Sequence, residues 1–252
     1  NVYSLTKAGA KSVGVSVDEL ANMLKTQELL AGTGFDDMND AQAKFKKLLE
    51  ETGSEEAALA KMCTEKDIPY CLSSVASLSL EQVAPNLNGK GWFQLYPPKD
   101  KTIRDDIIKR ALESDYSALV VTVDIPATSR KERLLKAGIT IPPKLNLRTF
   151  FQALAKPIWA LNTLLHGMPS FGTMTKYEFF TQDKIDNGWN EMPRYVDWQY
   201  LEEIKALWNR PIIIKGILDE EDALKASTVA DAIWLSNHGG RQIDLVPNPL
   251  QL

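Results

Sequence analysis

From about Ile68 onward, short apolar runs alternate with amphipathic stretches, and this alternation limits the possible folds more than any other feature. The run over 118–124 is apolar at almost every position, as expected of a strand that is covered on both faces. Strands alternating with helices favour a parallel sheet with right-handed crossovers. The predicted fold class is therefore α/β, with about five clear strands in a parallel sheet, as in part of a barrel. The predicted strands are 68–72, 92–96, 118–124, 211–215 and 232–235, and the predicted helices between them are 105–113, 200–208 and 219–226.

The residues before this alternation indicate helices. Apolar side chains recur at helical spacing within 40–49, and Ser54 followed by two glutamates is typical of a capped helix start. We therefore predict a mostly helical N-terminal segment over residues 1–66 and a partial barrel over residues 67–252. Within the barrel, a long insert at about 132–198 separates the third strand from the fourth.

Composition narrows the classes of function. The chain has 252 residues and a formal net charge of −4, which argues against a nucleic-acid binder. Its two cysteines, Cys63 and Cys71, cannot form a disulfide framework, so we expect a cytoplasmic or other intracellular compartment. No run reaches the ~20 apolar residues of a membrane span, and no secretory signal opens the sequence. Because the sequence begins at Asn1 without a methionine, we expect a processed, trimmed or partial product.

Each predicted strand ends in polar residues. In a parallel barrel the carboxyl ends of the strands share one face, and active sites lie on that face. A lysine that ends an isoleucine run is costly unless it meets an anion or an electron-rich ligand. The side chains expected to converge on this face are Ser73, Gln94, Tyr96, Thr122, Asp124, Lys215, Ser236 and His238.

The strongest chemical signal follows the fifth strand, in the string Ser-Asn-His-Gly-Gly-Arg over residues 236–241. His238 can take a proton near neutral pH, and Arg241 can hold a carboxylate with two parallel hydrogen bonds. The two glycines between them let the backbone approach a ligand closely. A base beside a carboxylate clamp suits removal of a proton or hydride from the carbon next to a carboxylate. The alternative is a polar loop in which His238 only caps a neighbouring group.

These residues resemble the family of FMN-dependent 2-hydroxy-acid dehydrogenases and oxidases, which includes glycolate oxidase, L-lactate dehydrogenase and mandelate dehydrogenase. The family uses a (β/α)8 barrel, so the resemblance implies a fold of the (β/α)8 TIM-barrel type, in an incomplete form with about five clear strands. The resemblance covers about residues 68–249 and rests on the strings Trp-Phe-Gln-Leu-Tyr (92–96), Leu-Val-Val-Thr-Val-Asp (119–124), Ile-Lys-Gly (214–216) and Ser236 to Asp244. It implies oxidation of a small L-2-hydroxy acid to the 2-oxo acid through FMN, with oxygen, a quinone or a cytochrome as the electron acceptor. It also implies a homo-oligomer, and we expect no metal site.

By this resemblance, His238 is the base that takes the substrate proton, and Asp124 is the carboxylate partner of its imidazolium. Tyr96 donates a hydrogen bond to the substrate, while Arg241 and Lys131 hold the substrate carboxylate. Lys215 is the cation that favours negative charge on the reduced flavin. The full set of flavin contacts implied by the resemblance is Ser73, Gln94, Thr122, Lys215 and Ser236.

Three departures from the family pattern bear on activity. Lys131 stands where the family usually has a second substrate arginine, with Arg130 one residue earlier, and a lysine loses the two-pronged grip. The family's first strand, with its Pro-Thr-Ala-like flavin contacts, has no evident counterpart. The same holds for the Asp-Gly-Gly-x-Arg and Gly-Arg segments with which the family holds the FMN phosphate. We therefore expect a chain that is incomplete at both ends relative to the family.

These departures leave other hypotheses open. One is a non-catalytic or fragmentary homologue that acts as a structural or regulatory subunit. Another is a flavin-free barrel of the sugar-phosphate isomerase type, which fits the fold but not the His-Gly-Gly-Arg string. Flavin absorbance in the purified protein discriminates both from the enzyme hypothesis.

Residues 147–165 of the insert are rich in apolar and aromatic side chains, among them Phe150, Phe151 and Trp159. In the membrane-associated lactate and mandelate dehydrogenases, a loop in this region is similar and contacts the bilayer. A helix lying in the membrane interface, which would make the protein peripheral to a membrane, is one interpretation. The other is a segment that covers the mouth of the barrel or forms a subunit contact.

Overall fold

The computed structural model describes residues 38–125, 136, 150–151, 154–166, 170–177, 196–240, 246 and 248–249. Its contacts divide the chain into two compact units, residues 1–70 and residues 71–252. The boundary predicted after residue 66 stays a prediction. Lys131 and Arg241, both predicted to hold the substrate, lie outside the described residues.

The described part of the first unit contains two helices, α3 (Met38–Thr52) and α4 (Glu55–Glu65), which pack against each other. The first was expected from the helical spacing of its apolar residues, and the second from its start at Ser54 with two glutamates. Ser54 occupies the N-cap position of α4, but its hydroxyl makes no capping hydrogen bond and instead donates to the Glu56 carboxylate at 3.0 Å. The prediction that the Ser54 hydroxyl caps the helix is therefore wrong, because its oxygen accepts no backbone N–H of the first turn.

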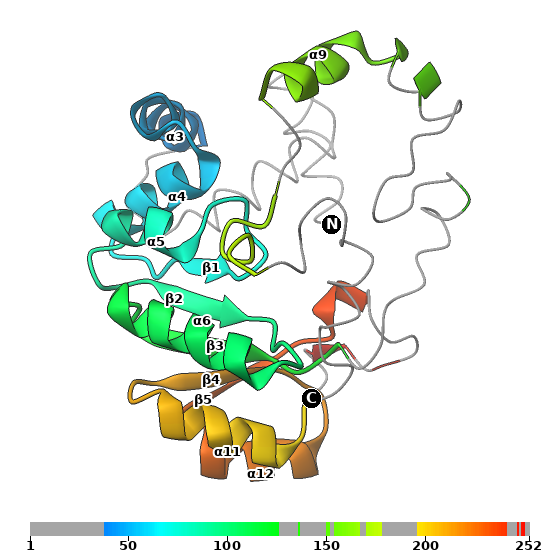
Figure 1. The fold of residues 1–252 in the computed structure, drawn as a ribbon. Coiled ribbons are helices and arrows are strands. Elements are labelled where there is room, and N and C mark those ends of the chain that lie inside the picture. Colours follow the sequence, from blue (N-terminus) through cyan, green and yellow to red (C-terminus); the bar gives the residue numbers. More distant parts are fainter. Residues whose placement is uncertain are drawn as a thin grey trace, which may run out of the picture. The chain divides into compact units, whose positions relative to one another are not determined.

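The second unit is built on a five-stranded parallel sheet in which strand order equals chain order (Figure 1). All five predicted strands are present, with bounds that differ by a few residues. Parallel neighbours in sequential order are the arrangement found in the wall of a β/α barrel, so the α/β fold class is confirmed. The strands are β1 (Cys71–Ser73), β2 (Trp92–Leu95), β3 (Ala118–Thr122), β4 (Ile212–Ile217) and β5 (Ala232–Leu235).

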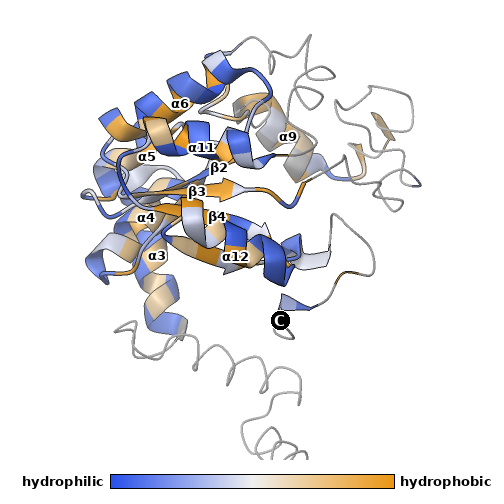
Figure 2. Ribbon diagram, turned by 90° about the horizontal axis from the view of Figure 1, so that it is seen from below, coloured by the Kyte–Doolittle hydropathy of each residue, from blue (hydrophilic) through white to orange (hydrophobic). Residues whose placement is uncertain are grey.

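Three longer helices of the second unit, α6 (Lys101–Glu113), α11 (Trp198–Leu207) and α12 (Glu220–Val229), lie side by side along the sheet (Figure 1). Two short elements, α5 (Leu80–Val83) and η1 (Ala84–Asn86), precede β2. In Figure 2, β3 carries mostly hydrophobic colours, whereas hydrophilic and hydrophobic stretches alternate along α6. The helices thus turn an apolar side toward the sheet and a polar side toward solvent.

Each of these three helices begins at an aspartate whose side chain accepts a backbone N–H of the first turn. The caps are Asp100, Asp197 and Asp219. Such caps satisfy N–H groups that have no partner inside the helix. Because the caps precede the first apolar residues, α6 and α11 begin before the predicted starts at 105 and 200.

The sheet interior is fullest around β3, all five residues of which are buried. Ala118, Val120 and Ile213 form a buried cluster, and Cys71 and Trp92 pack against it. Burial raises the pKa of the Cys71 thiol to about 11, so this cysteine stays protonated at neutral pH and acts as a small apolar residue.

The last strand, β5, is the least covered of the five. Trp234 and Leu235 are 42% and 41% exposed, and adjacent residues of a strand point to opposite faces. Among the described residues, no strand pairs with the outer edge of β5. Both faces and one edge of this strand are therefore open within the described part of the chain.

The described part of the insert contains α9 (Pro157–His166), of which several apolar side chains are exposed. Leu164 is 83% exposed, and Ile158 is 77% exposed. The same holds for Phe150, Phe151, Leu154, Leu161 and Leu165. Of the helices in the described ranges, none is both long and apolar enough to cross a membrane.

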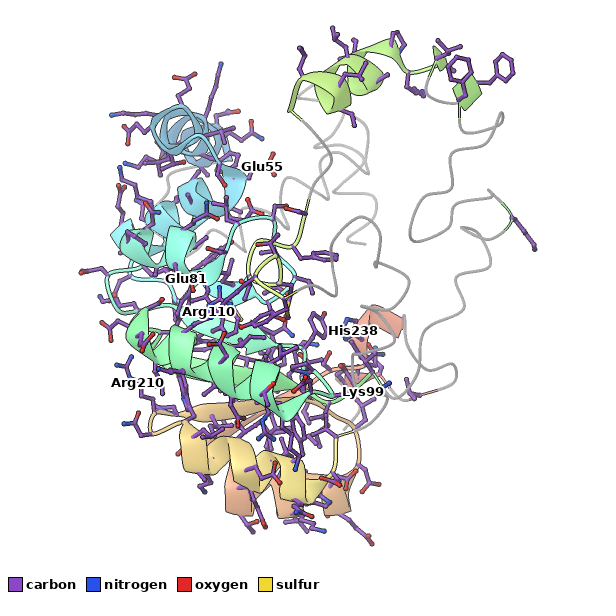
Figure 3. The ribbon with its side chains drawn as sticks, in the orientation of Figure 1. Glu55, Glu81, Lys99, Arg110, Arg210 and His238 are labelled. Atoms are coloured by element: carbon purple, nitrogen blue, oxygen red, sulfur yellow. The ribbon has the colours of Figure 1, made fainter. Side chains whose placement is uncertain are left out.

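Residues 171–177, within the insert, are tied to α5 and α6 through Arg110. The guanidinium donates to both carboxylate oxygens of Glu81, at 2.5 and 3.0 Å, and to the Thr173 carbonyl and the Tyr177 hydroxyl, both at 3.0 Å (Figure 3). Gly172 permits the close approach, because a Cβ there would lie 2.3 Å from the backbone nitrogen of Ser79.

Replacing Arg110 with methionine is expected to lower the free energy of unfolding by about 2 kcal/mol, because hydrogen bonds to charged groups contribute ~1.5–3 kcal/mol. Urea unfolding at pH 7 measures the change, and Lys109→Met, on an exposed neighbouring side chain, is the control. A loss no larger than that of the control would show that this cluster does not stabilise the fold.

The destabilisation caused by Arg110→Met is also expected to shrink in acid. Burial is the largest single effect on Glu81 and opposes its ionisation, but the hydrogen bonds and charge of Arg110, together with hydrogen bonds from the backbone and Ser79, lower the pKa of Glu81 below 4.5. A carboxyl with a lowered pKa in the folded state stabilises the fold above its unfolded pKa, and this contribution is lost as the pH falls. The difference between wild type and variant should therefore be full at pH 7 and narrow below about pH 4.5; a constant difference would contradict the assignment to Glu81.

Candidate active site

The carboxyl ends of the five strands bring together all of the predicted site residues that the structure describes. Figure 3 shows His238 beyond the carboxyl end of the sheet, in the short 3-10 turn η3 (His238–Gly240) that follows β5. Tyr96, Asp124, Lys215 and His238 form one polar cluster. A second row of hydrogen-bonded side chains consists of Ser73, Gln94 and Thr122.

Asp124 is the centre of the cluster. One carboxylate oxygen, Oδ1, lies 2.9 Å from Nδ1 of His238, and the other, Oδ2, lies 3.5 Å from Nζ of Lys215. The Asp124 side chain is only 5% exposed, and Oδ2 has no hydrogen-bond partner among the described residues. Because little water screens this carboxylate, its charge acts strongly on the imidazole and on the ammonium group.

His238 turns its second ring nitrogen toward Tyr96. With Nδ1 directed at Asp124, Nε2 is the nitrogen left to take a proton, and it lies 3.4 Å from the Tyr96 hydroxyl. The backbone of His238 has a φ of +56°, a left-handed conformation that is uncommon outside glycine. Its N–H donates to the Ser236 hydroxyl at 3.0 Å. Ser236 thus contributes to holding the histidine in an unusual backbone geometry, a role different from the flavin contact that the sequence predicts.

Tyr96 is positioned as a hydrogen-bond donor. Burial, together with the nearby negative charge of Asp124, raises the pKa of Tyr96, so the phenol keeps its proton at neutral pH. The backbone N–H of Tyr96 donates to the hydroxyl of Ser74, which is completely buried. Ser74 was missed from the sequence, although it adjoins Ser73 in the serine pair that ends β1.

The second row joins three adjacent strands. Ser73 donates from Oγ to Oε1 of Gln94 at 2.9 Å, and Nε2 of Gln94 donates to Oγ1 of Thr122 at 2.6 Å. Gln94 keeps a second N–H, and the Thr122 hydroxyl keeps its proton, so both can still donate. Donors along the strand ends, with the Lys215 ammonium at the same end of the sheet, fit the polar edge of a flavin ring.

The arrangement can therefore perform two linked tasks. A histidine backed by a carboxylate can remove a proton from a bound molecule, with a tyrosine hydroxyl beside it to orient that molecule. The neighbouring row and the lysine can hold a flat cofactor and stabilise negative charge on it.

Comparison with known proteins places the sequence in a known family. Residues 43–252 match the model of the family described as FMN-dependent dehydrogenase. Over 196 residues the chain is 39% identical to an L-lactate dehydrogenase of Vibrio parahaemolyticus, and this match covers 75% of the chain and 51% of that enzyme. It is 38% identical over 203 residues to the L-lactate dehydrogenase of Vibrio cholerae, with 78% of the chain and 53% of that enzyme covered. The chain thus spans about half the length of the curated relatives it matches.

Solved structures give the same result. A crystal structure of the monotopic membrane protein (S)-mandelate dehydrogenase superposes with a TM-score of 0.71 at 30% identity, covering 78% of this chain and 53% of that one. A mandelate oxidase superposes with a TM-score of 0.59 at 27% identity, covering 78% of this chain and 48% of the other. The part of the chain that these matches cover therefore has the barrel fold of these enzymes.

Proposed function

Because this chain belongs to the FMN-dependent dehydrogenase family, we propose that its site serves the oxidation of a small L-2-hydroxy acid to the 2-oxo acid with FMN as the cofactor. The observation that carries the proposal is the buried Asp124 carboxylate, which lies 2.9 Å from the Nδ1 of His238 and leaves Nε2 facing the Tyr96 hydroxyl. The L-lactate and mandelate enzymes among the relatives support this class of substrate.

In this proposal each residue of the cluster has one task. Nε2 of His238 takes the proton from the substrate, and the Asp124 carboxylate stabilises the imidazolium that results. The Tyr96 hydroxyl donates a hydrogen bond to a substrate oxygen. Arg241 and Lys131 hold the substrate carboxylate, the arginine with two parallel bonds and the lysine as a point charge.

The flavin supplies the two-electron acceptor. Ser73, Gln94 and Thr122 would hold the polar edge of its ring, with Ser236 as a further contact, and Lys215 would stabilise negative charge on the ring. Oxygen, a quinone or a cytochrome would be the final electron acceptor.

The test is a titration of the purified chain with FMN, followed by anaerobic addition of L-lactate or L-mandelate. We expect binding near one FMN per chain and loss of absorbance between 350 and 500 nm with the L-acids. The D-acids are the control and should leave the spectrum unchanged. If FMN does not bind, the alternative of a non-catalytic structural or regulatory homologue is favoured; if FMN binds but no hydroxy acid bleaches it, another substrate class is required.

We also propose that the apolar surface of 150–165 makes a peripheral membrane contact. Its apolar side chains are exposed along α9, with Leu164 at 83% and Ile158 at 77%. An exposed apolar helix of this kind can lie in the interface of a bilayer without crossing it. The description of the mandelate dehydrogenase as a monotopic membrane protein favours this interpretation over a subunit contact.

Replacing both Ile158 and Leu164 with aspartate is expected to reduce co-sedimentation with phospholipid vesicles at least tenfold. The reason is that burial of each apolar side chain in the membrane interface would contribute ~1.5–3 kcal/mol to binding, and aspartate removes this contribution. Leu224→Asp, at an exposed apolar residue of α12 that is 67% exposed, is the matched control and should leave vesicle binding unchanged. If the double variant instead changes the oligomeric state in gel filtration, with vesicle binding intact, the segment is a subunit contact.

A further inference from the structure

Gly216, in β4 next to Lys215, lies against Asp124 more closely than any side chain would allow. A Cβ built on Gly216 would be 2.4 Å from Cβ of Asp124, 2.6 Å from its Cγ and 2.9 Å from its backbone nitrogen. Gly216 also has a φ of +112°, which residues other than glycine rarely adopt. It coincides with an irregularity in the pairing of β4 with β5, between Lys215 and Ile217.

The neighbouring backbone leaves Asp124 little room to move away. The N–H of Val123 donates to the carbonyl of Lys215 at 2.9 Å, which fixes the end of β3 against β4 at this point. A methyl group at position 216 would therefore displace the Asp124 side chain. Its two short contacts, with His238 and with Lys215, depend on that side chain staying in place.

We propose that Gly216 is a positioning residue of the active site: its missing side chain creates the space in which Asp124 sits between His238 and Lys215. The proposal rests on the proposed function, since it concerns the carboxylate that supports the base. The irregularity in β4 falls directly after Lys215, where the backbone passes close to Asp124. Gly216 thereby affects the chemistry of the histidine, because the hydrogen bond from Nδ1 to Asp124 determines which ring nitrogen of His238 carries the proton.

The test is Gly216→Ala, read by 15N NMR of the histidine ring nitrogens in the full chain without FMN. The chain has only two histidines, so His238 and His166 give separable signals that a His166→Gln variant assigns. In the wild type, neutral His238 should carry its proton on Nδ1, with Nε2 bare. In Gly216→Ala we expect the proton to distribute between the two nitrogens, as it should in Asp124→Ala, with His166 unchanged. His238 signals identical to wild type in Gly216→Ala, but altered in Asp124→Ala, would overturn the proposal.

A control variant separates the clash from backbone strain. Gly53 also has a positive φ, +69°, but a Cβ there meets nothing within 4 Å, so Gly53→Ala tests strain alone and should leave the His238 signals unchanged. If Gly216→Ala fails to fold, the double variant Asp124→Gly with Gly216→Ala tests whether the clash with the Asp124 side chain is the cause. It lacks both Asp124 side-chain atoms that the new methyl group would strike, so recovery of the native circular dichroism spectrum supports the proposal. A double variant that is equally unfolded would mean that Gly216 serves the strand itself, and the proposal would be wrong.

Activity adds a second readout that distinguishes this proposal from the proposed function. In a wild type that oxidises L-2-hydroxy acids, Gly216→Ala should reduce turnover ~10²-fold or more, because it disables the support of a general base. If no wild-type oxidation is found but the NMR change occurs, the placement of Asp124 by Gly216 stands and the proposed function fails. If oxidation is normal in both proteins and the NMR signals are unchanged, the role of Gly216 fails and the proposed function stands.

Discussion

Replacing His238 with alanine is expected to slow the reduction of bound FMN by an L-2-hydroxy acid by about 10²–10⁴-fold, the usual contribution of a general base. Nε2 is the ring nitrogen left free by the contact with Asp124, and its loss leaves the substrate proton without an acceptor. FMN binding should be retained, because all the side chains proposed to hold the ring except Ser236 belong to other strands. Anaerobic stopped-flow spectroscopy with L-lactate measures the rate.

The matched control is His166→Ala, which removes the other histidine of the chain, at the end of α9. Its rate of flavin reduction should equal that of the wild type. Flavin reduction at the wild-type rate in His238→Ala would exclude His238 as the base. Loss of FMN in the same variant would instead show that the histidine supports the cofactor site.

Replacing Lys215 with methionine is expected to slow flavin reduction by about 10²–10³-fold, the typical effect of removing one group that stabilises developing charge. The variant should also lower the midpoint potential of the bound flavin, since the negative charge on the reduced ring loses its cation. In addition, Asp124 Oδ2 would lose the ammonium group 3.5 Å away and remain buried without a partner. A buried acceptor left in this way costs ~1–3 kcal/mol of stability, so the variant should also unfold at lower urea concentration.

Potentiometric titration separates Lys215→Met from His238→Ala. The first should shift the flavin potential, whereas the second should slow reduction with little change in potential. Lys109→Met removes an exposed ammonium group on α6 and is the charge control. An unchanged potential in Lys215→Met would show that the ammonium group does not face the flavin and serves only to balance Asp124.

The sheet could be predicted because each strand is a compact apolar run, and its polar carboxyl end follows from parallel topology alone. Parallel topology also predicts that Asp124, Lys215 and His238 lie on one face of the sheet. The register between neighbouring strands and the local path of the backbone could not be predicted from the sequence. The sharing of one carboxylate between His238 and Lys215, and the support of Tyr96 by Ser74, depend on ångström-scale offsets between strands.

Small residues were the hardest to predict for the same reason. Gly216 is part of the Ile-Lys-Gly string, but its importance lies in its close approach to Asp124 after another strand rather than in its own chemistry.

The Ser54 cap was predicted wrongly because spacing does not reveal that the hydroxyl donates to the Glu56 carboxylate while its oxygen accepts no backbone N–H. The starts of α6 and α11 were placed late because apolar periodicity marks the packed face of a helix rather than its first turn.

The strands of the sheet differ in burial, and this difference affects the local stability of the segments that carry His238 and Asp124. The loop that carries His238 follows β5, whose residues are the most exposed of the five described strands, while Asp124 follows β3, whose residues are all buried. Local opening is cheapest where few apolar contacts are broken, so amide exchange should be slowest in β3 and fastest in β5. The proposed base therefore follows the strand that should open most easily, and its partner follows the strand that should open least. A ligand that contacts both His238 and Asp124 would link the edge strand β5 to the central strand β3. Binding of such a ligand should therefore raise the free energy of unfolding and slow amide exchange in β5.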